Sequence, residues 1–195
     1  MQRMRSTLAC LAVMILLGAG SAEAGASRRG RTDILIGLGS LASQEVTDYG
    51  SITLDADDGT ALSFMFRHHF SSNVAFEIDL ITESDTMRHK YQGTTYETVD
   101  ADTFWWYANL LIHVMETPVA PYVVAGVGHF SHEADYPGGD IDESGGALQV
   151  GVGVDGHFSR NLVWDFDVRM LSYEFEEFQE DWNRLLFSGR LGFRF

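Results

Sequence analysis

Apolar and polar side chains alternate almost without error over the last twelve residues of the chain, Arg184–Phe195. The odd positions carry leucines, phenylalanines and one glycine, whereas three of the even positions are arginines. A period of two predicts a β-strand with one oily face and one cationic face. The terminal Phe195 suits a lipid-facing anchor at a bilayer interface. The stretch therefore favours the closing strand of a membrane barrel over the last strand of a soluble sandwich.

The same alternation recurs in seven earlier segments, each close to the length that a tilted membrane strand requires. The eight expected strands are residues 33–44, 60–70, 74–84, 103–116, 121–133, 147–158, 162–175 and 183–195. Three links between them are short and polar, namely 71–73, 117–120 and 159–161. The other four are long, namely 45–59, 85–102, 134–146 and 176–182. Alternating short and long links predict an all-β fold, an eight-stranded antiparallel up-and-down transmembrane β-barrel with its short turns in the periplasm.

Charged residues gather on one face of these strands, and that face must point into the barrel. An arginine facing lipid at the bilayer midplane costs about 2–4 kcal/mol, and an unpaired buried charge in a soluble core is also prohibitive. We therefore expect a lumen in which opposite charges pair, with strand glycines such as Gly37 and Gly39 leaving room for long arginines, and with Arg184 at the outer rim. The expected lumen charge network is Arg67, Glu77, Asp79, Asp155, Asp165, Asp167, Arg169, Arg190 and Arg194.

The first 24 residues have the three parts of a secretory signal peptide. Two arginines precede an apolar run at Leu8–Ala19, and a small-residue cleavage site ends at Ala24. The run is too short to span a bilayer as a helix. We expect cleavage after residue 24, a periplasmic N-terminal segment at 25–32 and an outer-membrane barrel domain at 33–195, exported by the Sec route to the outer membrane of a Gram-negative cell. The one cysteine, Cys10, would leave with the signal peptide.

The charge balance limits the partners. The chain has 28 acidic and 13 basic residues, a net charge of −15, so nucleic-acid binding is not expected. Many of the acids fall in the long links, where divalent cations could bridge to lipopolysaccharide phosphates. Asp140 and Asp142 imitate the start of a calcium loop, but Gly151 stands where its bidentate glutamate should be. A solvated acidic surface is the simpler interpretation, and neither a metal nor a cofactor is expected.

Two stretches resemble the small OmpA-like and opacity-type outer-membrane barrels. Pro121–Gly128 looks like their fifth strand, and Gln149–Asp155 with the following turn and Leu162–Tyr173 looks like their sixth-to-seventh hairpin. The resemblance implies the barrel fold, with chaperones and the barrel-assembly machinery as partners during biogenesis. In a departure from the longer members, no periplasmic peptidoglycan-binding domain is expected after the barrel. The C-terminal residues that resemble the assembly signal are Phe187, Leu191, Phe193 and Phe195.

One group invites an enzymatic reading. His129, Ser131 and Glu133 share a strand face, as a histidine–serine pair with an acidic partner does in the lipid A deacylases, which are also eight-stranded barrels. In that family, however, the pair lies on the seventh strand, and here strand seven has no histidine. A polar rim where the strand leaves the bilayer is the alternative.

The leading hypothesis is a monomeric, non-enzymatic envelope protein, set in lipid and lipopolysaccharide, that gives structural support or makes surface contacts through acidic loops. The second hypothesis is a lipid A-modifying enzyme. The third is a narrow small-solute channel, which paired charges in an eight-stranded lumen would obstruct.

Overall fold

The computed structural model describes residues 28–42, 44–49, 52–56, 58–91, 94–134, 141–175 and 180–195. These residues form ten strands and no helix: β1 (Thr32–Leu41), β2 (Gln44–Tyr49), β3 (Ile52–Ala56), β4 (Gly59–His69), β5 (Val74–Tyr91), β6 (Thr94–His113), β7 (Val119–Ala134), β8 (Ile141–His157), β9 (Leu162–Phe175) and β10 (Glu180–Arg194). In this part of the chain no helix has the length and apolar character needed to cross a membrane. The expected signal peptide at 1–24 lies outside the described residues.

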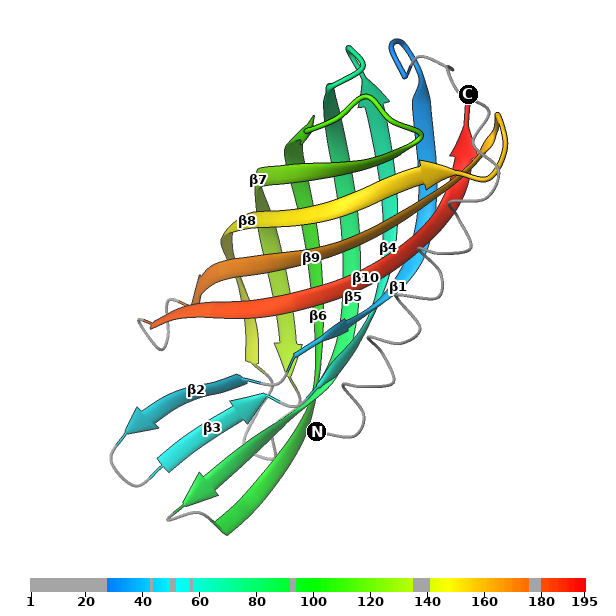
Figure 1. Ribbon diagram of the computed structural model, residues 1–195. Helices are drawn as coiled ribbons and strands as arrows, with labels where there is room; N and C mark the ends of the chain where they lie inside the picture. The colour runs from blue at the N-terminus through cyan, green and yellow to red at the C-terminus, as the bar shows by residue number, and fades with distance from the viewer. Residues whose placement is uncertain are drawn as a thin grey trace.

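Eight of the strands close into an antiparallel barrel (Figure 1). β1 completes the ring because it pairs with β10 on one side and with β4 on the other. Its Ile36, for example, lies opposite Leu191 in β10 and opposite Phe64 in β4. The expected fold class, an eight-stranded up-and-down barrel, is confirmed. The short turns, the start of β1 and Phe195 lie at one end, here called the turn end, and the other end is the loop end.

The alternation in the sequence sets the two faces of the wall. Ile36, Leu110, Val127, Leu148 and similar residues are exposed around the outside, while their strand neighbours are buried in the lumen. Such a belt matches the lipid-facing band of an outer-membrane barrel. The alternation along residues 162–175 places Trp164 on the outer face with the other apolar residues. It is nevertheless only 2% exposed, because its ring lies over Gly156 and contacts the rings of Phe158 and Phe166.

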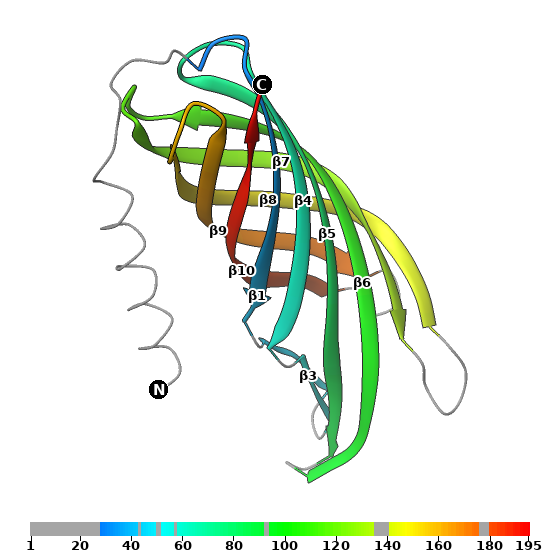
Figure 2. The ribbon, with the colours of Figure 1, turned by 90° about the vertical axis from the view of Figure 1, so that its right-hand side faces the viewer.

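The expected long loops are wrong in large part, because strands continue through them. β5 runs on to Tyr91, and β6 begins at Thr94. β2 and β3 form a hairpin that begins at Gln44 and ends at Ala56, and β3 pairs with the end of β5. β8 and β10 also start earlier than expected, at Ile141 and Glu180. The result is a four-stranded extension, β2-β3-β5-β6, beyond the loop end of the barrel (Figures 1 and 2). Outside a bilayer both strand faces meet water, so the apolar alternation used to find strands disappears there.

At the turn end the boundaries move by a few residues. β1 begins at Thr32, β6 ends at His113 and β7 begins at Val119, so the barrel wall includes one residue of the segment assigned to 25–32. The turns at 70–73 and 158–161 are closed by backbone hydrogen bonds from Phe70 N to Val74 O and from Phe158 N to Leu162 O, each 2.9 Å.

Candidate functional site

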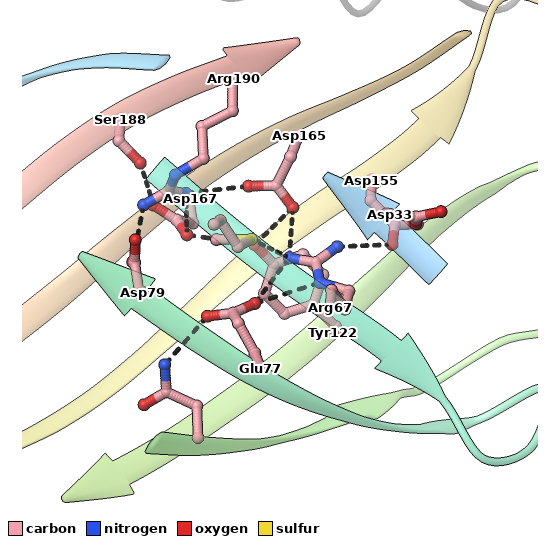
Figure 3. Close-up of polar contacts among 12 residues, drawn as sticks. Asp33, Arg67, Glu77, Asp79, Tyr122, Asp155, Asp165, Asp167, Ser188 and Arg190 are labelled. Atoms are coloured by element: carbon pink, nitrogen blue, oxygen red, sulfur yellow. Dashed lines mark hydrogen bonds and ion pairs between the residues drawn. The ribbon is translucent and has the colours of Figure 1, made fainter. Parts of the chain in front are cut away.

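The lumen holds the largest concentration of polar side chains in the described part of the molecule. Alternation along β4, β5, β8, β9 and β10 turns all nine residues of the expected charge network inward, and each is at most 5% exposed. Figure 3 shows the central contacts, with side chains from β4, β5, β7, β8, β9 and β10 converging on one another. Because contacting members of this network, such as Asp79 and Arg190, lie up to 111 positions apart in the sequence, closure of the barrel is what brings them together.

Arg67 on β4 connects several carboxylates in the part of the central network that lies towards the turn end. Its Nη2 lies 2.9 Å from Glu77 Oε2 and 2.8 Å from Asp165 Oδ2, and its Nη1 lies 3.0 Å from Asp155 Oδ2. The guanidinium carbon also lies 5.1 Å from the ring centroid of Tyr122, within cation–π range. Arg67 therefore ties β4 to β5, β8 and β9 across the lumen (Figure 3).

Arg169 and Arg190 hold the next layer. Arg169 contacts Asp167 at 2.6 Å, Glu77 at 2.8 Å and Asp79 at 3.1 Å. Arg190 contacts Asp167 at 2.7 Å, Asp165 at 3.0 Å and Asp79 at 3.2 Å. Every carboxylate of this layer thus serves more than one arginine. Asp167 also accepts a hydrogen bond from Ser188, and Asp165 accepts one from Tyr122 at 2.9 Å.

The mouth at the turn end has a second cluster, most of which the sequence did not reveal. Arg194 makes a two-bond contact with Asp33, each bond 2.7 Å, so its partner is not one of the five acids expected for it. His69 Nε2 lies 2.9 Å from Asp33, and His113 Nε2 lies 2.7 Å from Asp155. The sixth participant, Arg28, comes from the segment before β1.

Towards the loop end an apolar layer follows, and then a third polar cluster. Trp105, Tyr107, Phe130 and Tyr173 line the apolar layer together with aliphatic residues, and all are buried. Beyond it Arg184 Nη1 lies 2.7 Å from both Glu83 and Asp85. The expectation that Arg184 sits on an open rim is wrong, because the long β5 places two inward carboxylates beside it.

This arrangement fills the described part of the lumen with paired, buried side chains. Removing one partner of a buried ion pair costs about 3–5 kcal/mol, so these contacts constrain which strands can meet. Among the described residues no group of three or more histidine, cysteine, aspartate or glutamate side chains could hold a metal ion.

The residues of the enzymatic alternative lie outside the lumen. His129, Ser131 and Glu133 point outward from β7, as expected from their spacing. Residues two positions apart on a strand have Cα atoms about 7 Å apart, so the three side chains follow one another in a row along the outer wall. Of the two calcium-loop residues, Asp140 lies outside the described part. Asp142 lies in the extended β8, and its side chain is exposed.

The residues of the expected assembly signal share the outer face of β10. Phe187, Leu191, Phe193 and Phe195 are 46% to 66% exposed. Phe195 is also tied to the start of β1, because its N–H donates to Thr32 O at 2.9 Å. The last residue of the chain therefore takes part in closing the ring.

Comparisons with known proteins agree with this geometry. A family profile described as "Outer membrane protein beta-barrel domain" matches residues 10–195. OprG from Pseudomonas aeruginosa is similar in structure, with a TM-score of 0.62 and 12% identity over 86% of this chain and 96% of that one. Neisserial surface protein A has a TM-score of 0.60 and 16% identity over 85% and 98% of the two chains.

Ail, the attachment invasion locus protein of Yersinia pestis, has a TM-score of 0.54 and 16% identity over 86% of this chain and 99% of that one. At these identities the likeness shows the fold alone. Among curated proteins none has a significant sequence match. The closed ring, the outer apolar belt and the profile match together place the chain: it belongs to the outer membrane protein β-barrel domain family and is a small bacterial outer-membrane barrel.

Proposed function

We propose that this protein is a non-enzymatic surface barrel that contacts its partner through the extension at the loop end. The observation that carries the proposal is the length of β5 and β6, which have 18 and 20 residues. A tilted strand crosses a bilayer in about 9–11 residues, so roughly half of this hairpin projects beyond it. β2 and β3 widen the projecting hairpin into a sheet.

The filled lumen supports a role at the surface. The ion-pair layers of Arg67, Arg169 and Arg190 lie in series with the apolar layer around Trp105 and Tyr107. An eight-stranded barrel is just wide enough for side chains to fill it. Passage of solutes is therefore the weaker interpretation of this fold.

Charge gives the chemistry of the partner. At the loop end Asp58, Asp100, Asp102, Glu133 and Asp142 are exposed, against the exposed Arg88. A negatively charged surface attracts basic protein segments and repels polyanions. Ail has been solved in complex with the heparin analogue sucrose octasulfate, which is an anion. We do not extend that ligand class to this chain, because its exposed carboxylates would repel it.

Binding by the barrel in nanodiscs tests the proposal, with immobilised lysozyme as a basic probe and heparin as an anionic one. The first variant combines Asp100→Asn, Asp102→Asn, Glu133→Gln and Asp142→Asn, and Glu116→Gln at the turn end is the control. We expect the wild type to bind lysozyme in a salt-sensitive manner and the fourfold variant to lose this binding. Neither protein should bind heparin. Equal lysozyme binding by the wild type and the fourfold variant would refute the surface proposal.

A second variant separates surface contact from passive envelope support. Residues 88–98 are replaced by Asn-Gly, a sequence that suits a two-residue hairpin turn between the paired Met87 and Val99. Surface contact predicts that this folded, shortened barrel loses binding. If it instead restores full detergent resistance to a deletion strain and binds like the wild type, envelope support is the function.

A further inference from the structure

The segment before β1 folds back across the turn end of the barrel. Arg31 N donates to Arg28 O at 2.9 Å, which closes a tight turn, and Gly30 within it has a φ of 72°. Two further backbone bonds fix this turn to the end of β4, from Gly30 N to His69 O at 2.8 Å and from His69 N to Arg31 O at 2.9 Å. Glycine adopts positive φ without steric cost, so Gly30 permits the reversal.

The turn directs the side chain of Arg28 into the mouth. Although it precedes the wall, Arg28 is only 6% exposed. Its Nη2 lies 2.8 Å from Asp155 Oδ1 on β8 and donates to Thr117 O, in the β6–β7 turn, at 3.2 Å. In the ring β8 is three strands from β1, with β10 and β9 between them, so the side chain reaches the far wall.

Asp155 connects this contact to the interior. Its Oδ2 accepts from Arg67 at 3.0 Å and lies 2.7 Å from His113 Nε2, while Oδ1 faces Arg28. His113 in turn stacks on His69, with ring centroids 5.6 Å apart. Arg28 thus joins the lumen network from a turn, whereas the members described above lie on strands of the wall.

We propose that Arg28–Arg31 form a latched lid over the turn-end mouth, and that the bond from Arg28 to Asp155 controls the access of water and small solutes to the lumen network. The turn takes this position only where β1, β4 and β8 already surround the mouth, so the latch forms after the barrel closes. A lid on a hydrogen-bonded turn can open locally while the wall stays paired.

Thiol labelling tests the lid. The full chain carries one cysteine, so a Cys10→Ala background leaves an introduced thiol as the sole reporter. The reporter is Val163→Cys on β9, a position that is 2% exposed inside the mouth and packs with Leu35 and Met65. The barrel is held in nanodiscs, its folding is checked by heat-modifiable migration, and the rate of reaction with a small maleimide is measured.

Arg28→Gln should give roughly tenfold faster labelling of the reporter, because labelling follows the population of the open mouth. Arg31→Gln is the matched control: it removes the same charge from the same turn, but its side chain is exposed, and labelling should stay at the wild-type rate. Gly30→Val, which leaves Arg28 in place but strains the turn, should label fast as well. If Arg28→Gln and Gly30→Val both label at the wild-type rate in folded barrels, the lid is overturned.

Discussion

Arg169 illustrates at the residue scale how the lumen charges are held. Its side chain is fully buried and contacts Asp167 on its own strand and Glu77 and Asp79 on β5. Arg169→Ala would leave these carboxylates short of one cation in a confined space. We expect a loss of about 3–5 kcal/mol, less where lumen water reaches the site. The urea midpoint of the folded barrel in micelles measures this loss.

The control for this prediction is Arg31→Ala, which removes an exposed arginine and should leave the midpoint nearly unchanged. The double variant Arg169→Ala, Asp167→Asn should recover part of the loss, since it also removes one uncompensated charge. A midpoint for Arg169→Ala equal to that of Arg31→Ala would mean that water, not the arginine, compensates these acids.

Replacement of Gly128 on β7 is the subject of a second prediction at the residue scale. A Cβ there would meet the backbone oxygen of Trp106 and lie 2.6 Å from Cδ1 of Tyr107. Gly128→Ala should therefore destabilise the barrel by about 1–3 kcal/mol through overpacking. Gly146→Ala on β8 is the matched control, because a Cβ there meets nothing within 4 Å. Similar unfolding midpoints for the two variants would contradict the close approach of β6 to β7.

Residue patterns could predict which side chains face the lumen, but not which of them pair. A period of two assigns Arg194 and Arg190 to the inner face equally well. Their partners, Asp33 for one and Asp79, Asp165 and Asp167 for the other, depend on strand register and stagger around the ring. Arg28 was beyond such reasoning, because a turn with positive φ, not alternation, directs it inward.

At the scale of the element, strands within the bilayer were predictable and those outside it were not. Phe104–Val114 alternates because one side meets lipid. Thr94–Asp100 continues the same strand, but Tyr96 and Val99 are its only apolar residues, so apolar side chains do not recur at every second position. In such a segment the conformation depends on pairing with the neighbouring strand. The pattern of apolar residues in the sequence does not reveal that pairing.

The closing strand β10 gives a prediction at this scale. Phe195 exchanges two backbone hydrogen bonds with Thr32, and its side chain is 66% exposed on the lipid face. We expect Phe195→Asp to reduce the yield of folded barrel strongly, because the change affects both ring closure and the residue that resembles the assembly signal. Heat-modifiable migration of outer-membrane fractions measures the folded share.

Phe70→Asp is the matched control for the closing strand. Phe70 is also an exposed aromatic at the turn end, 59% exposed, but follows β4 rather than the last strand. Phe70→Asp should reduce the yield of folded barrel less than Phe195→Asp does. Equal folded yields would show that the position of an aromatic anchor in the closing strand is immaterial. Arg184, expected on a rim, could not serve as the control, since it is buried beside Glu83 and Asp85.

At the scale of the whole molecule, two filled layers follow one another along the described part of the lumen, and we expect each to act as a seal. On the turn side Arg190 and its partners fill the lumen with ion pairs, and towards the loop end Trp105 belongs to the apolar layer. Ions crossing the barrel would have to displace both layers. Hydrophobic constrictions can gate by dewetting, and we expect the paired charges to obstruct a continuous water path as well.

Two seals in series make the last prediction non-additive. In planar bilayers we expect no steady current from the wild type, and none from Arg190→Ala or Trp105→Ala, because each single variant keeps the other seal. The double variant should conduct, provided that heat-modifiable migration shows it folded. Steady wild-type currents would restore the channel hypothesis. Currents from either single variant as large as those from the double variant would show that one layer alone closes the lumen.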